Sequence, residues 1–386
     1  MPSARDTPRP PEPDPTPRPA PNGAPWPVAV LGATGAVGQT FVRMLDGHPW
    51  FRVTELAASE RSAGRRYADA ARWLEGEMPA ALRDVLVLPC DPAAVTAPVV
   101  FSALDSAAAD AVEPAFAAAG RLVLSNAKSY RMASDVPLLI PEVNWPHAAL
   151  LDTQPIARGW PAGGALVTNA NCSATVIAMA LAPLHAAFGV ERVFVATMQA
   201  VSGAGYPGVP SLDILGNVVP YIGDEEPKIE AELRKLLGTV EGGAARDHDA
   251  RVAAHANRVP VEHGHTACLS VGFSRRAAAA DVVAVLRAWR GPDGLAPWLA
   301  RCPTAPPTPL AVTDAADRPQ PRRDRDAGAG MTVTVGRVRE DPLLDVRLVA
   351  TGHNTVRGAA GGSVLNAELL ALGAPPCGGP VGPFRR

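Results

Sequence analysis

The residues on either side of Cys172 predict a local structure that can make its thiol reactive. A short β-prone run, residues 165–168, precedes it, and an apolar, Ala-rich run, residues 176–188, follows it. This pattern predicts a strand, a tight turn and a helix, with Cys172 at the helix N-terminus. There the unpaired N–H groups and the helix dipole favour a thiolate, so we expect a pKa below the usual value of about 8.5. A buried structural cysteine is the alternative.

A second chemical motif lies near the start of the chain. Residues 28–31 form a short buried-strand pattern, a G-x-x-G-x-x-G segment follows it, and residues 39–45 have a helical pattern. Glycines at that spacing let the backbone turn tightly and approach a pyrophosphate at the helix N-terminus. An ordinary Gly-rich turn is the alternative. The residues expected to bind the dinucleotide are Gly32, Thr34, Gly35, Ala36, Val37 and Gly38.

The loop after the next predicted strand, residues 53–57, bears on the choice of cofactor. In NAD-specific folds an acidic residue about 20 positions after the glycines binds the ribose 2′-hydroxyl. Here that count reaches Ser59, and the neighbouring Arg61 and Ser62 suit a 2′-phosphate. The loop therefore predicts NADP, although Glu60 is compatible with either cofactor.

An acid/base group and an anchor for an anionic substrate are the parts that remain. Arg258 and His265 are seven residues apart, on a predicted strand (residues 253–260) and the turn after it. Residues at an odd spacing on one strand face opposite sides, but Gly264 interrupts the period, so both side chains can face one cleft. A surface histidine and an arginine on a solvated edge are the alternatives.

Strands alternate with helices over the first part of the chain, which predicts an α/β fold with a Rossmann-type, doubly wound parallel sheet. After residue 188 the pattern changes to a second α+β domain with a mixed sheet. We predict an NADP-binding domain of residues 27–168 and 353–375 and a catalytic and dimerisation domain of residues 169–352.

Three details of this organisation can be tested. Residues 229–237 read as an amphipathic helix. Residues 303–330 are rich in Pro, Asp and Arg and are expected to be a long loop that does not pack by itself. The Gly- and Pro-rich residues after Leu372 are expected to be loose.

Composition narrows the class of protein. A net charge of −2 over 386 residues predicts no general attraction to nucleic acid or membrane. The five cysteines are widely spaced without a C-x-x-C pair, which argues against a metal site or disulfides and predicts a reducing, cytoplasmic location. Residues 1–27 hold eleven prolines, so we expect residues 1–26 to be a disordered extension. Lysine occurs only at positions 128, 228 and 235.

Taken together, these motifs resemble the aspartate-β-semialdehyde dehydrogenase family over roughly residues 28–370. The matching segments are residues 32–38, 125–127 with Arg131, 171–173, 199–205, 258–261 with 264–265, and 353–361. Residues 206–213 and 318–322 are similar to the archaeal and fungal branch. The resemblance implies NADPH-dependent reduction of L-aspartyl-4-phosphate to L-aspartate-4-semialdehyde, in lysine, threonine and methionine biosynthesis, by a homodimer or homotetramer.

The resemblance also implies a role for each site residue. Cys172 is the nucleophile that forms a thioester, and His265 is the general acid/base. Gln199 positions the acyl group, and Arg258 binds the α-carboxylate. The other expected contacts are Glu225 with the α-ammonium, Arg131 and Lys228 with the phosphate, Asn126 with the substrate, and Ser202, Gly203 and Asn354 with the nicotinamide. Pro227 lies between Glu225 and Lys228 and leaves the directions of their side chains open.

Other functions remain open. An acyl-CoA reductase on the same scaffold, such as a malonyl-CoA reductase, uses the same thiol and cofactor and differs in the leaving group. A substituted catalytic position would indicate a non-catalytic NADP-binding protein, but no catalytic position of this chain is substituted. An N-acetylglutamyl-phosphate reductase fits less well because the residues that flank Cys172 differ.

Overall fold

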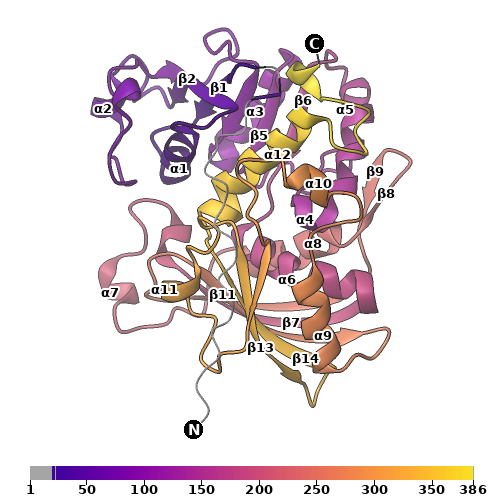
Figure 1. Ribbon diagram of the computed structural model, residues 1–386. Coiled ribbons are helices and arrows are strands. Elements are labelled where there is room, and N and C mark those ends of the chain that lie inside the picture. Colours follow the sequence, from indigo (N-terminus) through magenta and orange to yellow (C-terminus); the bar gives the residue numbers. More distant parts are fainter. Residues whose placement is uncertain (1–19, 22, 386) are drawn as a thin grey trace.

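The first half of the chain folds around a sheet of six parallel strands in the order β3-β2-β1-β4-β5-β6. The computed structural model describes residues 20, 21 and 23–385 (Figure 1). The order of the strands reverses between β1 and β4, as in a doubly wound sheet. The strands are β1 (Trp26–Leu31), β2 (Phe51–Ala58), β3 (Leu88–Pro89), β4 (Val99–Ser102), β5 (Leu122–Ser125) and β6 (Ala165–Thr168).

Helices from both ends of the chain cover this sheet. The C-terminal α12 contributes Leu365 and Leu369 to the hydrophobic cluster that also holds Val28 and Phe101, and Figure 1 shows it beside β5 and β6. The helices are α1 (Ala36–Leu45), α2 (Tyr67–Ala70), η1 (Ala80–Leu82), α3 (Ser106–Ala118), α4 (Pro141–Asn144), η2 (Trp145–Ala149), α5 (Leu150–Arg158), α12 (Gly361–Leu372) and η5 (Gly382–Phe384).

The C-terminal residues pack beside the start of β1. Phe384 is buried and its ring packs edge-on against Trp26, with 5.0 Å between centroids. The expectation of a loose C-terminus is therefore wrong, because its apolar side chains return to the core. Trp26, the last residue of the predicted extension, begins β1; most of that extension, residues 1–19 and 22, lies outside the described residues.

The second half of the chain builds a mixed six-stranded sheet in the order β10-β7-β11-β14-β13-β12. The strands β7, β11, β14 and β13 pair antiparallel, and the two edge strands pair parallel. The predicted fold class is confirmed. The strands are β7 (Val190–Gln199), β10 (Arg251–Arg258), β11 (His265–Phe273), β12 (Leu310–Thr313), β13 (Val333–Glu340) and β14 (Val346–Gly352), with a separate hairpin of β8 (Thr239–Glu241) and β9 (Ala244–Arg246).

The long, almost fully buried α6 packs on this sheet and contacts α8 and α9. The other helices of this half are short, and α7 stands away from the sheet in Figure 1. The helices of this half are α6 (Cys172–Phe188), η3 (Val201–Ala204), α7 (Ser211–Ile214), α8 (Glu225–Leu236), α9 (Ala279–Ala288), α10 (Ala296–Leu299), α11 (Pro321–Asp324) and η4 (Val356–Ala360), a π-helical turn. Among the described residues, no helix is long and apolar enough to cross a membrane. The domain boundaries given above stay a prediction.

Residues 303–330 do pack, contrary to expectation. Their β12 adds a parallel edge strand beside β13, and α11 lies against the turn that leads to β11. A Cβ on Gly264 would lie 3.0 Å from the Pro321 side chain, and Arg325 Nη1 donates to the carbonyl of His263 at 3.2 Å. The segment has no periodicity of its own, and its order comes from these long-range contacts together with a local ion pair between Arg318 and Asp324.

The helix predicted over residues 229–237 begins four residues earlier, at Glu225. Pro227 lies in its first turn, where the missing N–H has no intrahelical acceptor to lose. Glu225 and Lys228 are therefore on one continuous helix, which settles the directions that Pro227 left open.

Candidate active site

Cys172 is the first residue of α6, as the sequence predicts. Asn171 caps the helix, and its Oδ1 accepts the N–H groups of Ser173 at 2.9 Å and Ala174 at 3.1 Å. The sulfur of Cys172 lies 3.1 Å from Nε2 of His265, the first residue of β11. The thiol and the imidazole therefore form one hydrogen-bonded pair.

The backbone fixes which nitrogen of His265 carries the proton. The N–H of Ala200 donates to Nδ1 at 3.1 Å. Because Nδ1 accepts, the neutral ring carries its proton on Nε2, toward the sulfur. Burial, aided by the charge of Arg258, lowers the pKa of His265 to about 3. A proton added to Nδ1 would also face the Ala200 N–H, so the geometry too favours the neutral ring.

The expected lowering of the pKa of Cys172 is wrong. Burial, with the charge of Glu225 adding to it, raises the pKa of Cys172 to about 12. Arg131, Arg258 and the N–H of Ser173 act in the opposite direction. The helix N-terminus thus contributes as predicted, but burial of the charged form outweighs it.

Arg258 and His265 face the same point from different strands. Arg258 ends β10, and its Nη1 donates to the carbonyl of Ala200 at 2.8 Å. A Cβ on Gly203 would lie 2.9 Å from Arg258 Nη1 and 3.1 Å from His265 Cε1. A side chain at this position would crowd both groups, so glycine lets the loop lie close over them.

Asn354 ties that loop to the turn before His265. Its Nδ2 donates to Ser202 Oγ at 2.8 Å, and its Oδ1 accepts the N–H of Gly264 at 2.9 Å. Ser202, Gly203 and Asn354, all expected at the nicotinamide, are therefore together beside the thiol–imidazole pair.

Glu225 holds two amides beside the nucleophile. Its Oε1 accepts Asn171 Nδ2 at 2.9 Å and Gln199 Nε2 at 3.0 Å. Gln199 ends β7, so this carboxylate joins the end of the second sheet to the cap of α6. The residue expected at the α-ammonium is thus buried and firmly oriented.

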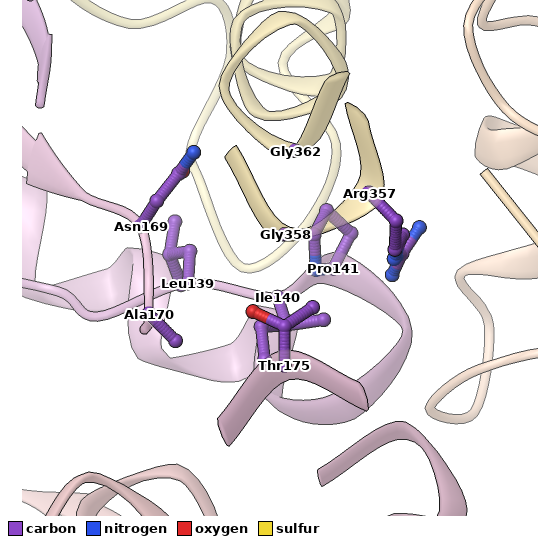
Figure 2. Close-up of a pocket in the computed structure, with 9 residues that line it drawn as sticks. All are labelled: Leu139, Ile140, Pro141, Asn169, Ala170, Thr175, Arg357, Gly358 and Gly362. Carbon is purple, nitrogen blue, oxygen red and sulfur yellow. The ribbon is translucent and has the colours of Figure 1, made fainter. Parts of the chain in front are cut away.

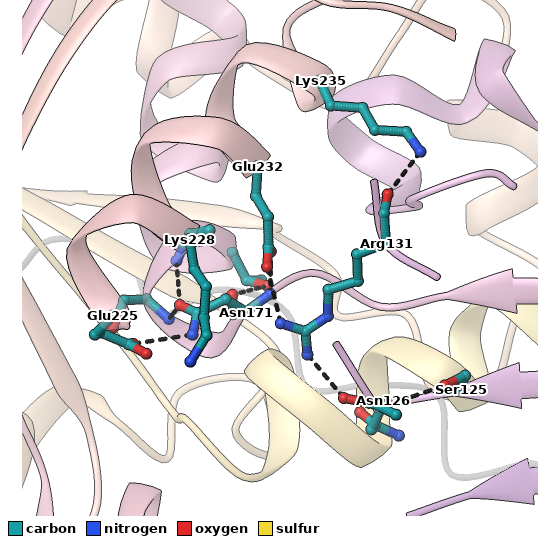
Figure 3. Close-up of polar contacts among 12 residues, drawn as sticks. Ser125, Asn126, Arg131, Asn171, Glu225, Lys228, Glu232 and Lys235 are labelled. Atoms are coloured by element: carbon teal, nitrogen blue, oxygen red, sulfur yellow. Dashed lines mark hydrogen bonds and ion pairs between the residues drawn. The ribbon is translucent and has the colours of Figure 1, made fainter. Parts of the chain in front are cut away.

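Figure 3 shows the two residues expected at the phosphate. Lys228 is one helical turn after Glu225 on α8, and Arg131 is on the loop after β5. Arg131 is buried, and its Nη2 donates to the carbonyl of Asn126 at 2.7 Å. Lys228 is half-buried, with Nζ 3.5 Å from the carbonyl of Gly223. Both cations line one open pocket of about 320 Å³, and Lys128 lines it too. The Asn126 side chain points elsewhere, with its Oδ1 accepting from Asn169 Nδ2 at 3.1 Å.

Behind the nucleophile, η4 packs directly on the start of α6. A Cβ on Gly358 would lie 2.7 Å from the Cβ of Cys172, so this position requires glycine. The adjacent Arg357 is paired with Glu142 through both Nη atoms, at 2.9 and 2.6 Å. Figure 2 shows Arg357, Gly358 and Thr175 around a cavity of about 10 Å³, enough for one water molecule.

The Gly-rich turn after β1 fits a dinucleotide pyrophosphate. Gly32 has a φ of 70°, and a Cβ there would lie 2.6 Å from the carbonyl of Ala103. A Cβ on Gly38 would lie 2.2 Å from the carbonyl of Gly32. Gly35 caps α1 without a side chain, so no capping side chain takes the first N–H groups of α1, and an anion can accept them.

The turn after β2 lies next to this cradle, since the N–H of Ala33 donates to the carbonyl of Ala57 at 3.0 Å. The N–H of Ser62 closes the turn on the carbonyl of Ser59 at 2.8 Å. Ser59 and Arg61 are exposed, whereas Ser62 is buried, so the first two are the better placed to meet a 2′-phosphate.

Comparison with known proteins gives the same picture. Residues 27–151 match the semialdehyde dehydrogenase NAD-binding domain, and residues 181–357 match the semialdehyde dehydrogenase dimerisation domain. An aspartate-semialdehyde dehydrogenase of Archaeoglobus fulgidus is 49% identical over 344 residues, 89% of this chain and 97% of the relative. The chain belongs to the aspartate-semialdehyde dehydrogenase family. It is an oxidoreductase, as the sequence predicts.

Fungal relatives of this aspartate-semialdehyde dehydrogenase family member are close as well. The Candida albicans enzyme is 43% identical over 356 residues, 88% of this chain and 96% of that protein. A crystal structure of the Candida albicans enzyme with NADP has a TM-score of 0.81 and 42% identity, and covers 90% of this chain and 98% of that one. The resemblance to archaeal and fungal members is confirmed.

Sequence reasoning missed two buried residues of the site, Glu232 and Lys235. Glu225, Lys228, Glu232 and Lys235 recur at intervals of three, four and three residues, which places them on one helix face. The helix predicted from Ile229 includes Glu232 and Lys235 but leaves out Glu225 and Lys228, so the four residues are not recognised as one face. A helix started at Glu225 reveals it from sequence alone.

Proposed function

We propose that the chain catalyses the NADPH-dependent reductive dephosphorylation of L-aspartyl-4-phosphate to L-aspartate-4-semialdehyde, a step of lysine, threonine and methionine biosynthesis. The Cys172–His265 pair, at 3.1 Å and with Arg258 beside it, carries the proposal. The Cys172 sulfur attacks the acyl carbon, the bond from that carbon to the phosphate oxygen breaks, and a thioester forms, while the thiol proton leaves with the phosphate as hydrogen phosphate. NADPH, when bound, supplies the hydride.

His265 serves this path chiefly as a hydrogen-bond donor. To take the thiol proton as a general base it needs the Nε2 lone pair, and the Ala200 hydrogen bond opposes that tautomer. As a donor it stabilises the Cys172 thiolate and then the oxyanion of the thiohemiacetal. Collapse of that oxyanion gives the aldehyde and returns the thiolate without consuming a proton from His265.

The charges around the thiol suit a zwitterionic acyl phosphate. In this assignment Arg258 binds the α-carboxylate with its two-pronged guanidinium, and Glu225 binds the α-ammonium. Arg131 and Lys228 bind the phosphate, and Gln199 orients the acyl oxygen. The support is proximity, since the charges of Glu225, Arg131 and Arg258 all act on the pKa of Cys172.

The assembly and location are part of the same proposal. We propose a homodimer or homotetramer formed through the face of the second sheet that the helices leave open, where Phe194 is 44% exposed. The matching dimerisation domain covers that sheet. A cytoplasmic location suits a thiol nucleophile among five free cysteines.

A phosphate-dependent assay of NADP reduction tests the proposal. Aspartate semialdehyde with inorganic phosphate should reduce NADP, whereas malonate semialdehyde with CoA should give little or no reduction. Faster turnover with malonate semialdehyde and CoA would establish the acyl-CoA reductase instead. Binding of NADPH without turnover of either pair would establish the non-catalytic protein.

A further inference from the structure

The face of α8 that carries Glu225, Lys228, Glu232 and Lys235 organises the anionic end of the site (Figure 3). The residues point toward the start of α6 and toward the loop that holds Arg131. Glu232 and Lys235 are 2% and 1% exposed, so neither acts as a surface charge. Buried charges need specific partners, and those partners show what the helix face does.

Glu232 joins two functional elements with its two oxygens. Oε1 accepts from Arg131 Nη1 at 2.9 Å, and Oε2 accepts the backbone N–H of Asn171 at 2.5 Å. Asn171 directly precedes Cys172 and caps its helix. A single carboxylate therefore orients both a cation of the site and the peptide next to the nucleophile.

Lys235 holds the backbone of the same arginine. Its Nζ donates to the carbonyls of Arg131, Ala133 and Val136 at 2.6, 2.7 and 2.8 Å. Burial lowers its pKa to about 8, yet three carbonyl acceptors saturate its ammonium group. Arg131 is thus fixed from α8 at both its main chain and its side chain.

The side-chain geometry of Arg131 leaves part of the guanidinium for a ligand. Glu232 takes one Nη and the Asn126 carbonyl takes the other, so the pairing is not the two-pronged kind that saturates arginine. Nε has no hydrogen-bond partner among the described residues. Arg131 also lines the open pocket with Lys128 and Lys228.

We infer that Glu232 is a positioning residue that couples the binding of the phosphate group to the placement of Cys172. It holds Arg131 in one orientation at the pocket wall while it holds the peptide before the nucleophile. The inference rests on the proposed function, in which that pocket receives the phosphate. Glu232 carries a negative charge beside an anion site, so its charge lowers the affinity for phosphate. Its benefit is therefore in positioning, because a misplacement of a reacting group by about 1 Å costs on the order of 10² in rate.

Glu232→Gln separates geometry from affinity. In the aldehyde-oxidising direction we expect kcat to fall about 10-fold or more. The KM for inorganic phosphate should stay level or fall, because a repulsive charge is gone, and the KM for NADP should not change. Glu230→Gln is the matched control: it is on the same helix, but its carboxylate accepts the N–H of Ala254 on β10. It should leave kcat at the wild-type value.

A double-mutant cycle tests whether Glu232 acts through Arg131. In the Arg131→Ala background the cost of Glu232→Gln in kcat should shrink by about threefold or more, because the two changes remove one contact. The inference would be overturned if the losses in kcat of the two mutations multiplied fully, if Glu232→Gln left kcat unchanged, or if Glu230→Gln lowered kcat as much as Glu232→Gln does.

Protection of Cys172 from iodoacetamide by inorganic phosphate measures phosphate binding near the thiol without turnover. Wild-type protein that lacks phosphate-dependent turnover would refute the proposed function, whereas wild-type turnover with an unaffected Glu232→Gln would refute only this inference.

Discussion

Two Arg–Glu pairs lie near the start of α6, one through Asn171 and the other through Gly358, and they differ in their exposure and in how many Nη atoms join the arginine to the carboxylate. Arg357 and Glu142 are each 1% exposed and joined through both Nη atoms. The side chains of Arg131 and Glu232 are 10% and 3% exposed and are joined through one Nη atom. The first pair is sealed among protein atoms, whereas the second forms part of an open pocket wall.

The difference separates a structural ion pair from one available to a ligand. In the fully buried pair both Nη atoms meet the carboxylate, and its value lies in holding η4 and Gly358 against Cys172. Within the described part of the chain, Nε lacks a hydrogen-bond partner in both arginines, so the pairs differ in exposure and in their Nη contacts. A one-pronged pair at a pocket leaves an oriented cation with unused hydrogen-bonding capacity. Residue type does not distinguish the two cases, but the exposure and the number of contacts do.

Cys172 is the proposed nucleophile, so its loss should have the largest effect. Cys172→Ala should abolish turnover and leave NADPH binding intact, because the cofactor cradle is made by other residues. Mass spectrometry of protein mixed with acyl phosphate without NADPH should show an acyl adduct on the Cys172 peptide. An adduct on Cys268, or turnover by the Ala variant, would contradict the thioester path.

Breaking the sealed pair should cost stability. Arg357→Met leaves Glu142 buried without its partner, which should lower the free energy of unfolding by about 3–5 kcal/mol. Urea unfolding followed by circular dichroism measures the loss. Arg131→Met is the matched comparison and should cost clearly less, because Glu232 keeps the Asn171 N–H. Equal losses in the free energy of unfolding would show that the two ion pairs contribute equally to stability.

The pH dependence of alkylation tests which charges the thiol experiences. Because burial and Glu225 raise the pKa of Cys172, the rate of its reaction with iodoacetamide should keep rising from pH 7 to beyond pH 9. Arg131 favours the thiolate, so Arg131→Ala should react more slowly at each pH in that range. A plateau below pH 7 would mean that the free enzyme already holds a thiolate–imidazolium pair.

The smallest effect is expected at the cofactor, away from both pairs. Arg61→Ala should raise the KM for NADP by about 10-fold, the worth of a lost charge-assisted hydrogen bond, and change the KM for NAD little. Steady-state kinetics with both cofactors measure the ratio. An equal rise in both KM values would remove Arg61 from the 2′-phosphate assignment.

The sequence by itself determined the features that depend on local backbone geometry. The Gly32–Gly38 turn and the helix that begins at Cys172 follow from residues within a few positions of each other. Glycine spacing and hydrophobic period are local signals, so the fold class and the place of Cys172 at a helix N-terminus were predictable. The start of α8 was predictable as well, once the Glu225–Lys235 stripe is recognised.

Only the tertiary structure decided the electrostatics and the partners. Arg131 and Glu232 are 101 residues apart in sequence, and Glu142 and Arg357 are 215 apart. The raised pKa of Cys172 comes mainly from its burial, which belongs to the assembled fold and to no local motif. Desolvation and long-range contacts depend on what surrounds a residue in space, and that is why the local helix dipole gave the wrong sign for Cys172.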